Sequence, residues 1–132
     1  MPRYLGIDVG DQRTGLAISD EDGSFAFPRK VVSGGVEAAK EEIGLIMKEH
    51  AIEGIVIGLP QNFKGEDTRQ TDKVRHFGEM LKEIITVPVI FQNEILTSKQ
   101  IDKSGASTKN MQDASAAALI LQQFLDTRRL SQ

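Results

Sequence analysis

Two apolar runs, at residues 4–9 and 16–19, lie on either side of a short turn rich in glycine and polar residues. This pattern predicts two adjacent antiparallel strands. Asp8 interrupts the first run, and a carboxylate that is buried without a partner costs several kcal/mol. Gly6 and Gly10 flank it, so a phosphate, a metal ion or another backbone segment can come close. Asp8 is therefore the first candidate site residue; the alternative is that it caps a turn through its own backbone.

The rest of the chain alternates between extended and helical patterns. Residues 24–32 are extended in character, with Pro28 at an edge or a bend. The spacing of apolar residues predicts the later elements, which are a helix at 36–50, a strand at 55–57, a helix at 74–85, a strand at 89–91, a short helix at 97–105, a loop at 106–110, a helix at 113–125 and a frayed polar tail after Asp126. This order predicts an α/β fold in which a mixed sheet has helices on both faces.

Composition limits the class of protein. With 132 residues, 39% of them hydrophobic, the chain is predicted to form a single domain over residues 1–132. It has no cysteine, which excludes thiol nucleophiles and disulfide frameworks. No apolar run approaches the roughly 18 residues that span a membrane, and no signal peptide is recognisable. We therefore expect a soluble, cytoplasmic protein without a membrane partner, and the net charge of −3 argues against a general nucleic-acid coat.

Three acidic residues fall where ligands collect in an open α/β sheet, beyond the carboxyl ends of the strands. Asp8 lies on the first strand, Glu94 follows the last strand and Asp113 begins the final helix. If the first, fourth and fifth strands are neighbours, the carboxylates converge and need cations to offset their repulsion. Oxygen ligands suit Mg²⁺ or Mn²⁺, and two such ions can activate water for phosphodiester hydrolysis. The alternatives are a solvated strand end for Glu94 and a helix cap for Asp113.

Several basic residues could hold phosphates near these carboxylates. Arg13 and Lys109 are the candidates for substrate binding, because they are closest in sequence to the acidic residues. Lys64, Arg69 and Lys73 are interpreted as solvated charges.

Other chemistries are less consistent with the sequence. His50 and His76 have neither metal-ligand spacing nor a neighbouring nucleophile. The glycines match neither the dinucleotide fingerprint nor a P-loop. Aromatic residues make up 5% of the chain, which disfavours a base-stacking platform. A sugar kinase or actin-like ATPase also carries Asp-x-Gly on its first strand, but it normally needs two such domains.

Four motifs follow one another along nearly the whole chain. They are Gly6-Ile7-Asp8-Val9-Gly10 with Arg13 and Gly15, then Val56-Ile57-Gly58-Leu59-Pro60 with Gly65, then Glu94 with Leu96-Thr97-Ser98, and finally Asp113-Ala114-Ser115-Ala116-Ala117 with Leu119-Ile120-Leu121-Gln122. Any one of them is weak, but the ordered set resembles the YqgF (RuvX) family of bacterial ribonuclease H-like nucleases.

The resemblance implies a ribonuclease H-like fold, with a mixed five-stranded sheet and helices on both sides, and a metal-dependent nuclease site. By position, Asp8, Glu94 and Asp113 correspond to the acidic triad of the family, as catalytic residues and as ligands of Mg²⁺ or Mn²⁺. The family is described both as maturing the 5′ end of precursor 16S rRNA and as resolving Holliday junctions. We favour precursor rRNA over branched DNA as the nucleic-acid partner.

The sequence also departs from the family pattern. Asn93-Glu94-Ile95 stands where Asp-Glu-Arg is usual, and Lys64 stands where Asp is common. Ile95 cannot make the bidentate phosphate bond of an arginine. This difference motivates the hypothesis of an RNA-binding module that keeps the fold without turnover. A junction resolvase, by contrast, needs two active sites in a symmetric dimer, so both a monomer and a homodimer remain open.

Overall fold

The computed structural model describes residues 3–62, 64–94 and 109–130, and the side chains of the last segment from Ser115 to Arg128. Its elements are strands β1 (Arg3–Val9), β2 (Arg13–Ser19) and β3 (Ala26–Ser33), helix α1 (Gly35–Glu49), strand β4 (Ile52–Pro60), helix α2 (Arg69–Ile84), strand β5 (Val89–Glu94) and helix α4 (Lys109–Leu130). The predicted order of strands and helices is confirmed. No helix of the described segments is both long and apolar enough to cross a membrane.

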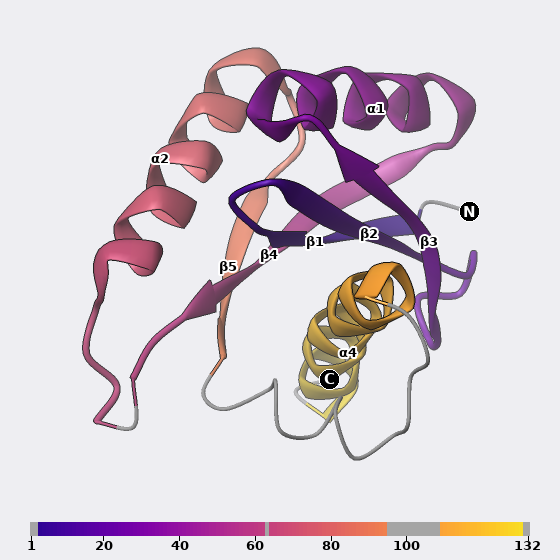
Figure 1. Ribbon diagram of the computed structural model, residues 1–132. Helices are drawn as coiled ribbons and strands as arrows, with labels where there is room; N and C mark the ends of the chain where they lie inside the picture. Colours follow the sequence, from indigo (N-terminus) through magenta and orange to yellow (C-terminus); the bar gives the residue numbers. More distant parts are fainter. Residues whose placement is uncertain (1–2, 63, 95–108, 131–132) are drawn as a thin grey trace.

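The strands form one mixed sheet in the order β3-β2-β1-β4-β5 (Figure 1). The first three strands are a meander of antiparallel pairs, with Leu5 opposite Ile18 in the first of them. β4 pairs in parallel with both β1 and β5. The first, fourth and fifth strands are therefore neighbours, as expected, and their carboxyl ends share one edge of the sheet.

Helices cover both faces of this sheet. Helices α1 and α2 lie on one face and α4 lies on the other (Figure 1). Because side chains alternate along a strand, Leu5 and Ile7 of β1 pack in the core beneath α1 and α2, whereas Tyr4 packs in the smaller core beneath α4. The same alternation directs position 8 of β1 to the α4 face.

Helix α4 is longer than the sequence predicts. It begins at Lys109, so the predicted loop is wrong for residues 109 and 110, and it continues to Leu130 instead of fraying after Asp126. Tertiary contacts explain the second difference: the guanidinium of Arg128 lies 5.0 Å from the centroid of the Tyr4 ring. Gln122 also accepts a hydrogen bond from the Ala26 backbone N–H at 2.8 Å. The short helix predicted at 97–105 lies outside the described residues.

Helix α4 approaches the backbone of β1 at a residue without a side chain. A Cβ atom added to Gly6 would lie 2.8 Å from the Cβ of Leu121 and 2.9 Å from the carbonyl oxygen of Ala117. The sequence allowed a phosphate, a metal ion or another backbone segment to lie close to Gly6, and the structure shows the third of these, the backbone of α4. A helix carbonyl cannot move aside without displacing the helix, so glycine is needed at this position.

We expect Gly6→Ala to lower the free energy of unfolding by about 1–3 kcal/mol, because the added methyl group overpacks the contact with α4. Urea denaturation monitored by circular dichroism measures the change. Gly44→Ala is the matched control, since nothing lies within 4 Å of a Cβ at this position in α1. It should stabilise the protein by up to about 1 kcal/mol through helix propensity. Equal effects of the two substitutions would contradict the packing argument.

Candidate active site

Two of the predicted acidic residues lie at the carboxyl edge of the parallel strands. Asp8 is the next-to-last residue of β1, and Glu94 is the last residue of β5, opposite Pro60 of β4. Ile7 pairs with Ile57, so the following residues, Asp8 and Gly58, are level with each other. Alternation of side chains directs both acidic residues to the α4 face of the sheet.

Gly58 makes the centre of this arrangement possible. It lies on β4, between the two strands that carry the acidic residues. A Cβ atom there would clash with the side chain of Ile120 on α4 and would lie 3.6 Å from Cγ of Glu94. The strand predicted at 55–57 stops before Gly58, whereas β4 continues to Pro60. The signal that could have identified it is a glycine inside an otherwise apolar strand.

Glu94 is a buried carboxyl group. The residue is 6% exposed, so the alternative of a solvated strand end is wrong. Its Oε1 atom is buried and has no hydrogen-bond partner in the described part of the chain. Burial, and after it the nearby charge of Asp8, raises the pKa of Glu94 from 4.5 to about 7. The structure thus places Asp8 close enough to Glu94 for the charges of the two carboxylates to repel each other.

Asp113 belongs to the second turn of α4, and its side chain lies outside the described residues. Its helix position is one turn before Ala117, which packs against Gly6 on the strand that carries Asp8. Among the described side chains, no group of three His, Asp or Glu residues gathers as a metal site. The triad of Asp8, Glu94 and Asp113 therefore stays a prediction.

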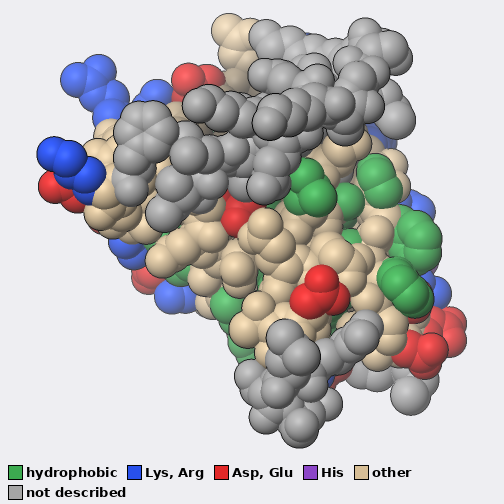
Figure 2. Space-filling model, turned by 90° about the horizontal axis from the view of Figure 1, so that it is seen from below, with side chains coloured by type: hydrophobic (Ala, Val, Ile, Leu, Met, Phe, Trp, Pro, Cys, Tyr) green, Lys and Arg blue, Asp and Glu red, His purple; other side chains and the backbone are tan. Residues whose placement is uncertain are grey.

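The predicted phosphate-binding residues differ in position. Arg13 begins β2, and because Gly15 pairs with Asp8, alternation places Arg13 on the same face as Asp8. Lys109 is the first residue of α4, and its side chain is outside the described part. Lys64 and Arg69 are exposed near the carboxyl end of β4. Figure 2 shows basic side chains at the rim of this face, and acidic side chains both at the rim and nearer the middle.

Gly10 has a structural role in the β1–β2 turn. A Cβ atom at this position would clash with the carbonyl oxygen of Arg13. The neighbour that Gly10 accommodates is therefore the backbone of the turn.

The arrangement of the chain agrees with the comparison to known families. The family described as "RuvX: Holliday junction resolvase" matches residues 2–127. The chain belongs to the RuvX family. A relative from Caldanaerobacter subterraneus subsp. tengcongensis is 38% identical, and the alignment covers 98% of this chain and 99% of that protein. A relative from Nitratidesulfovibrio vulgaris is 39% identical, with 94% and 93% covered. Both are named "Putative pre-16S rRNA nuclease".

Solved structures confirm the ribonuclease H-like fold of this RuvX-family chain. Thermus thermophilus RuvC in complex with a Holliday junction substrate superposes with a TM-score of 0.59 at 15% identity, covering 98% of this chain and 96% of that one. The fowlpox virus Holliday junction resolvase gives a TM-score of 0.58 at 10% identity, with 95% and 99% covered. At these identities the likeness concerns the fold alone.

We expect the charge of Glu94 to destabilise the folded protein when no cation is present. Its pKa is about 7 when folded and near 4.5 when unfolded, so the stability that the neutral carboxyl contributes is fully present below 4.5 and is lost as the pH rises through 7. Glu94→Gln removes the charge. In EDTA at pH about 8 it should raise the free energy of unfolding by up to about 3 kcal/mol, and near pH 4.5 this gain should disappear.

Urea denaturation at the two pH values measures this difference. Glu53→Gln is the control, because Glu53 is an exposed residue of β4. The same gain at both pH values would show that the charge of Glu94 is not its cause.

Proposed function

We propose that this chain is a Mg²⁺- or Mn²⁺-dependent endonuclease that matures the 5′ end of precursor 16S rRNA. The observation that carries the proposal is the buried carboxyl group of Glu94 beside Asp8, at the carboxyl edge of a ribonuclease H-like sheet. Membership of a nuclease family defines the class of enzyme. The names of relatives that cover nearly the whole chain support the rRNA substrate.

The chemistry of the acidic pair fits a divalent cation. Oε1 of Glu94 is buried without a hydrogen-bond donor among the described residues, and the neighbouring charge of Asp8 adds repulsion. A hard cation would satisfy this oxygen and offset the repulsion, and carboxylate oxygens are ligands that Mg²⁺ and Mn²⁺ accept. Asp8, Glu94 and, by its position on α4, Asp113 would hold two such ions. When bound, the ions would supply the charge that activates water and stabilises the leaving oxygen.

The protein around the acidic pair fixes the position of the two carboxyl groups and shields Glu94 from water. Strand pairing holds Asp8 and Glu94 in one sheet. Between them, Gly58 of β4 has no side chain, and Ile120 of α4 packs against the strand there. Arg13, on the same face as Asp8, would contact a substrate phosphate, and Lys109 at the start of α4 would do the same. In this arrangement the basic residues position the strand and the acidic residues serve the reaction.

A second candidate function is resolution of Holliday junctions, which the description of the family favours. It requires two active sites that cut two strands, and therefore a symmetric dimer. A third is RNA binding without turnover, because Ile95 replaces the usual arginine beside Glu94. The retained Asp8 and Glu94 favour the catalytic proposal over this third one.

We expect Asp8→Asn to reduce cleavage by roughly two orders of magnitude or more while the fold is kept, because the amide removes a charge that the reaction needs. A precursor 16S rRNA 5′ fragment and a synthetic four-way DNA junction are incubated in parallel with Mg²⁺, Mn²⁺ or EDTA. Asp22→Asn, an exposed acidic residue of the β2–β3 turn, is the control and should cleave like the wild type.

The substrate that is cut, in a metal-dependent way, distinguishes the two nuclease functions. Unchanged cleavage by Asp8→Asn would exclude the proposed site. A folded wild-type protein that binds the RNA but cuts neither substrate would support the binding module, and Ile95→Arg would then be the first change to test.

We further expect Mn²⁺ to stabilise the folded protein, because it binds an assembled site that the unfolded chain lacks. At a concentration about 100-fold above its dissociation constant the gain is about 2.7 kcal/mol. Thermal unfolding with and without the metal measures it. Asp8→Asn and Glu94→Gln should each lose most of the gain, whereas Asp22→Asn should keep it. A gain that is the same in all four proteins would place the metal elsewhere.

A further inference from the structure

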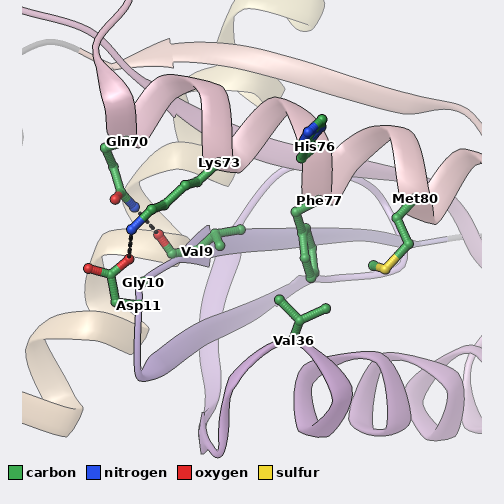
Figure 3. Close-up of a pocket in the computed structure, with 9 residues that line it drawn as sticks. All are labelled: Val9, Gly10, Asp11, Val36, Gln70, Lys73, His76, Phe77 and Met80. Carbon is green, nitrogen blue, oxygen red and sulfur yellow. Dashed lines mark hydrogen bonds and ion pairs between the residues drawn. The ribbon is translucent and has the colours of Figure 1, made fainter.

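A pocket of about 430 Å³ lies between α2, the β1–β2 turn and the start of α1 (Figure 3). We call it the α2 pocket. Val9, which lines it, directly follows Asp8, and consecutive residues of a strand point to opposite faces of the sheet. The α2 pocket therefore lies at the same edge as the acidic pair, on the other side of β1. Its volume falls in the range of small-molecule sites, roughly 300–1,000 Å³.

The inner part of the α2 pocket is apolar. Phe77 and Met80 of α2 face Val36 of α1 across it (Figure 3). Phe77 belongs to the core and is 4% exposed, but Val36 is 46% exposed although it is an apolar residue. A flat apolar group that entered here would cover Val36 and contact Phe77 and Met80.

The end of the pocket next to the β1–β2 turn is polar. Lys73 of α2 forms an ion pair with Asp11 of the turn, with 3.1 Å between Nζ and Oδ1 (Figure 3). Gln70 donates a hydrogen bond from Nε2 to the carbonyl oxygen of Val9 at 3.2 Å. The ion pair is exposed, with side-chain exposures of 54% and 65%. Exposed pairs contribute little to stability, so an anion can compete with Asp11 for Lys73.

We propose that the α2 pocket binds one nucleotide of the substrate strand. The base enters between Val36, Phe77 and Met80, and Lys73 exchanges Asp11 for the adjoining phosphate. A nucleotide combines an apolar flat face with a negative charge, and the pocket combines an apolar slot with a cation at its end. The proposal rests on the proposed function, because it takes the strand at the acidic pair to be the one that crosses the β1–β2 turn.

The first test measures RNA affinity in EDTA, where cleavage plays no part. A fluorescently labelled precursor 16S rRNA 5′ fragment is titrated with each variant and followed by anisotropy. Val36→Glu places a charge on the wall of the slot opposite Phe77 and Met80 and should weaken binding roughly fivefold or more. Leu45→Glu is the matched control, since it makes the same change on the same helix at a residue that is 47% exposed. Equal affinities of the two variants overturn the proposal.

The second test asks whether a base occupies the slot. RNA fragments that each lack one base are compared for the wild type and Val36→Glu. At one position, removal of the base should weaken binding by the wild type but not further weaken binding by Val36→Glu, because the two changes delete the same contact. If every abasic position affects both proteins equally, no base enters the pocket and the proposal fails.

The third test concerns the phosphate. Lys73→Gln should lower the slope of log affinity against log salt concentration by about 1, as expected for one lost phosphate contact. Lys82→Gln is the control, because Lys82 is also an exposed lysine of α2 and forms an ion pair of 3.1 Å, with Glu79. The same slope for both variants excludes Lys73 as the phosphate contact.

These results can be separated from the test of the proposed function. If Val36→Glu binds RNA as the wild type does while Asp8→Asn abolishes cleavage, the pocket proposal fails and the nuclease stands. If free adenosine monophosphate perturbs the Met80 and Val36 methyl signals in NMR spectra but no single base of the RNA matters, the pocket is a small-ligand site, and the proposal is likewise overturned.

Discussion

The burial of Glu94 beside Asp8 is the constraint on which the rest of the structure depends. Two carboxyl groups near one another, one of them shielded from water, repel each other and disfavour the charged state. An apolar side chain at position 94 would avoid this cost. The sheet topology instead places the two strands on either side of β4, where Gly58 has no side chain and Ile120 of α4 packs against the strand. The fold therefore keeps an electrostatic cost that a bound cation would relieve.

The two faces of strand β1 lie in different surroundings. Asp8 lies on the face that α4 covers, and Val9 lines the pocket beneath α2. The β1–β2 turn joins these two environments, and the ion pair between Asp11 and Lys73 connects the turn to α2. A nucleic acid that crossed this edge of the sheet would meet the acidic pair on one face of β1 and the apolar part of the α2 pocket on the other face.

Local sequence patterns were sufficient to predict most of the fold and some residues of the candidate site. A carboxylate inside an apolar run marks Asp8, and the alternation of elements predicts that β1, β4 and β5 are neighbours. The burial of Glu94 could not be predicted, because a glutamate at a strand end is normally solvated, and the packing of Ile120 against Gly58 beside it joins residues that are far apart in the sequence. The early start of α4 was missed because residues 109 and 110 lack an apolar repeat.

The α2 pocket also could not be predicted from the sequence. Phe77 has the spacing of an ordinary core residue within the helix predicted at 74–85, and it does belong to the core. The partners Asp11 and Lys73 are 62 residues apart, so no local pattern relates them. Lys73 was interpreted as a solvated charge, whereas in the structure it is exposed but paired. Such pairings depend on how α2 docks on the sheet, which the sequence pattern does not specify.

The direct contact of α4 with the backbone of β1 has a consequence for the distance between the helix and the sheet. A Cβ atom at Gly6 would lie 2.9 Å from the carbonyl oxygen of Ala117, so at this point the spacing between the two layers is set by backbone dimensions. The height of α4 above β1 is thus fixed at Gly6 without a long core side chain, and the turns of the helix that carry Lys109 and Asp113 are held at that height.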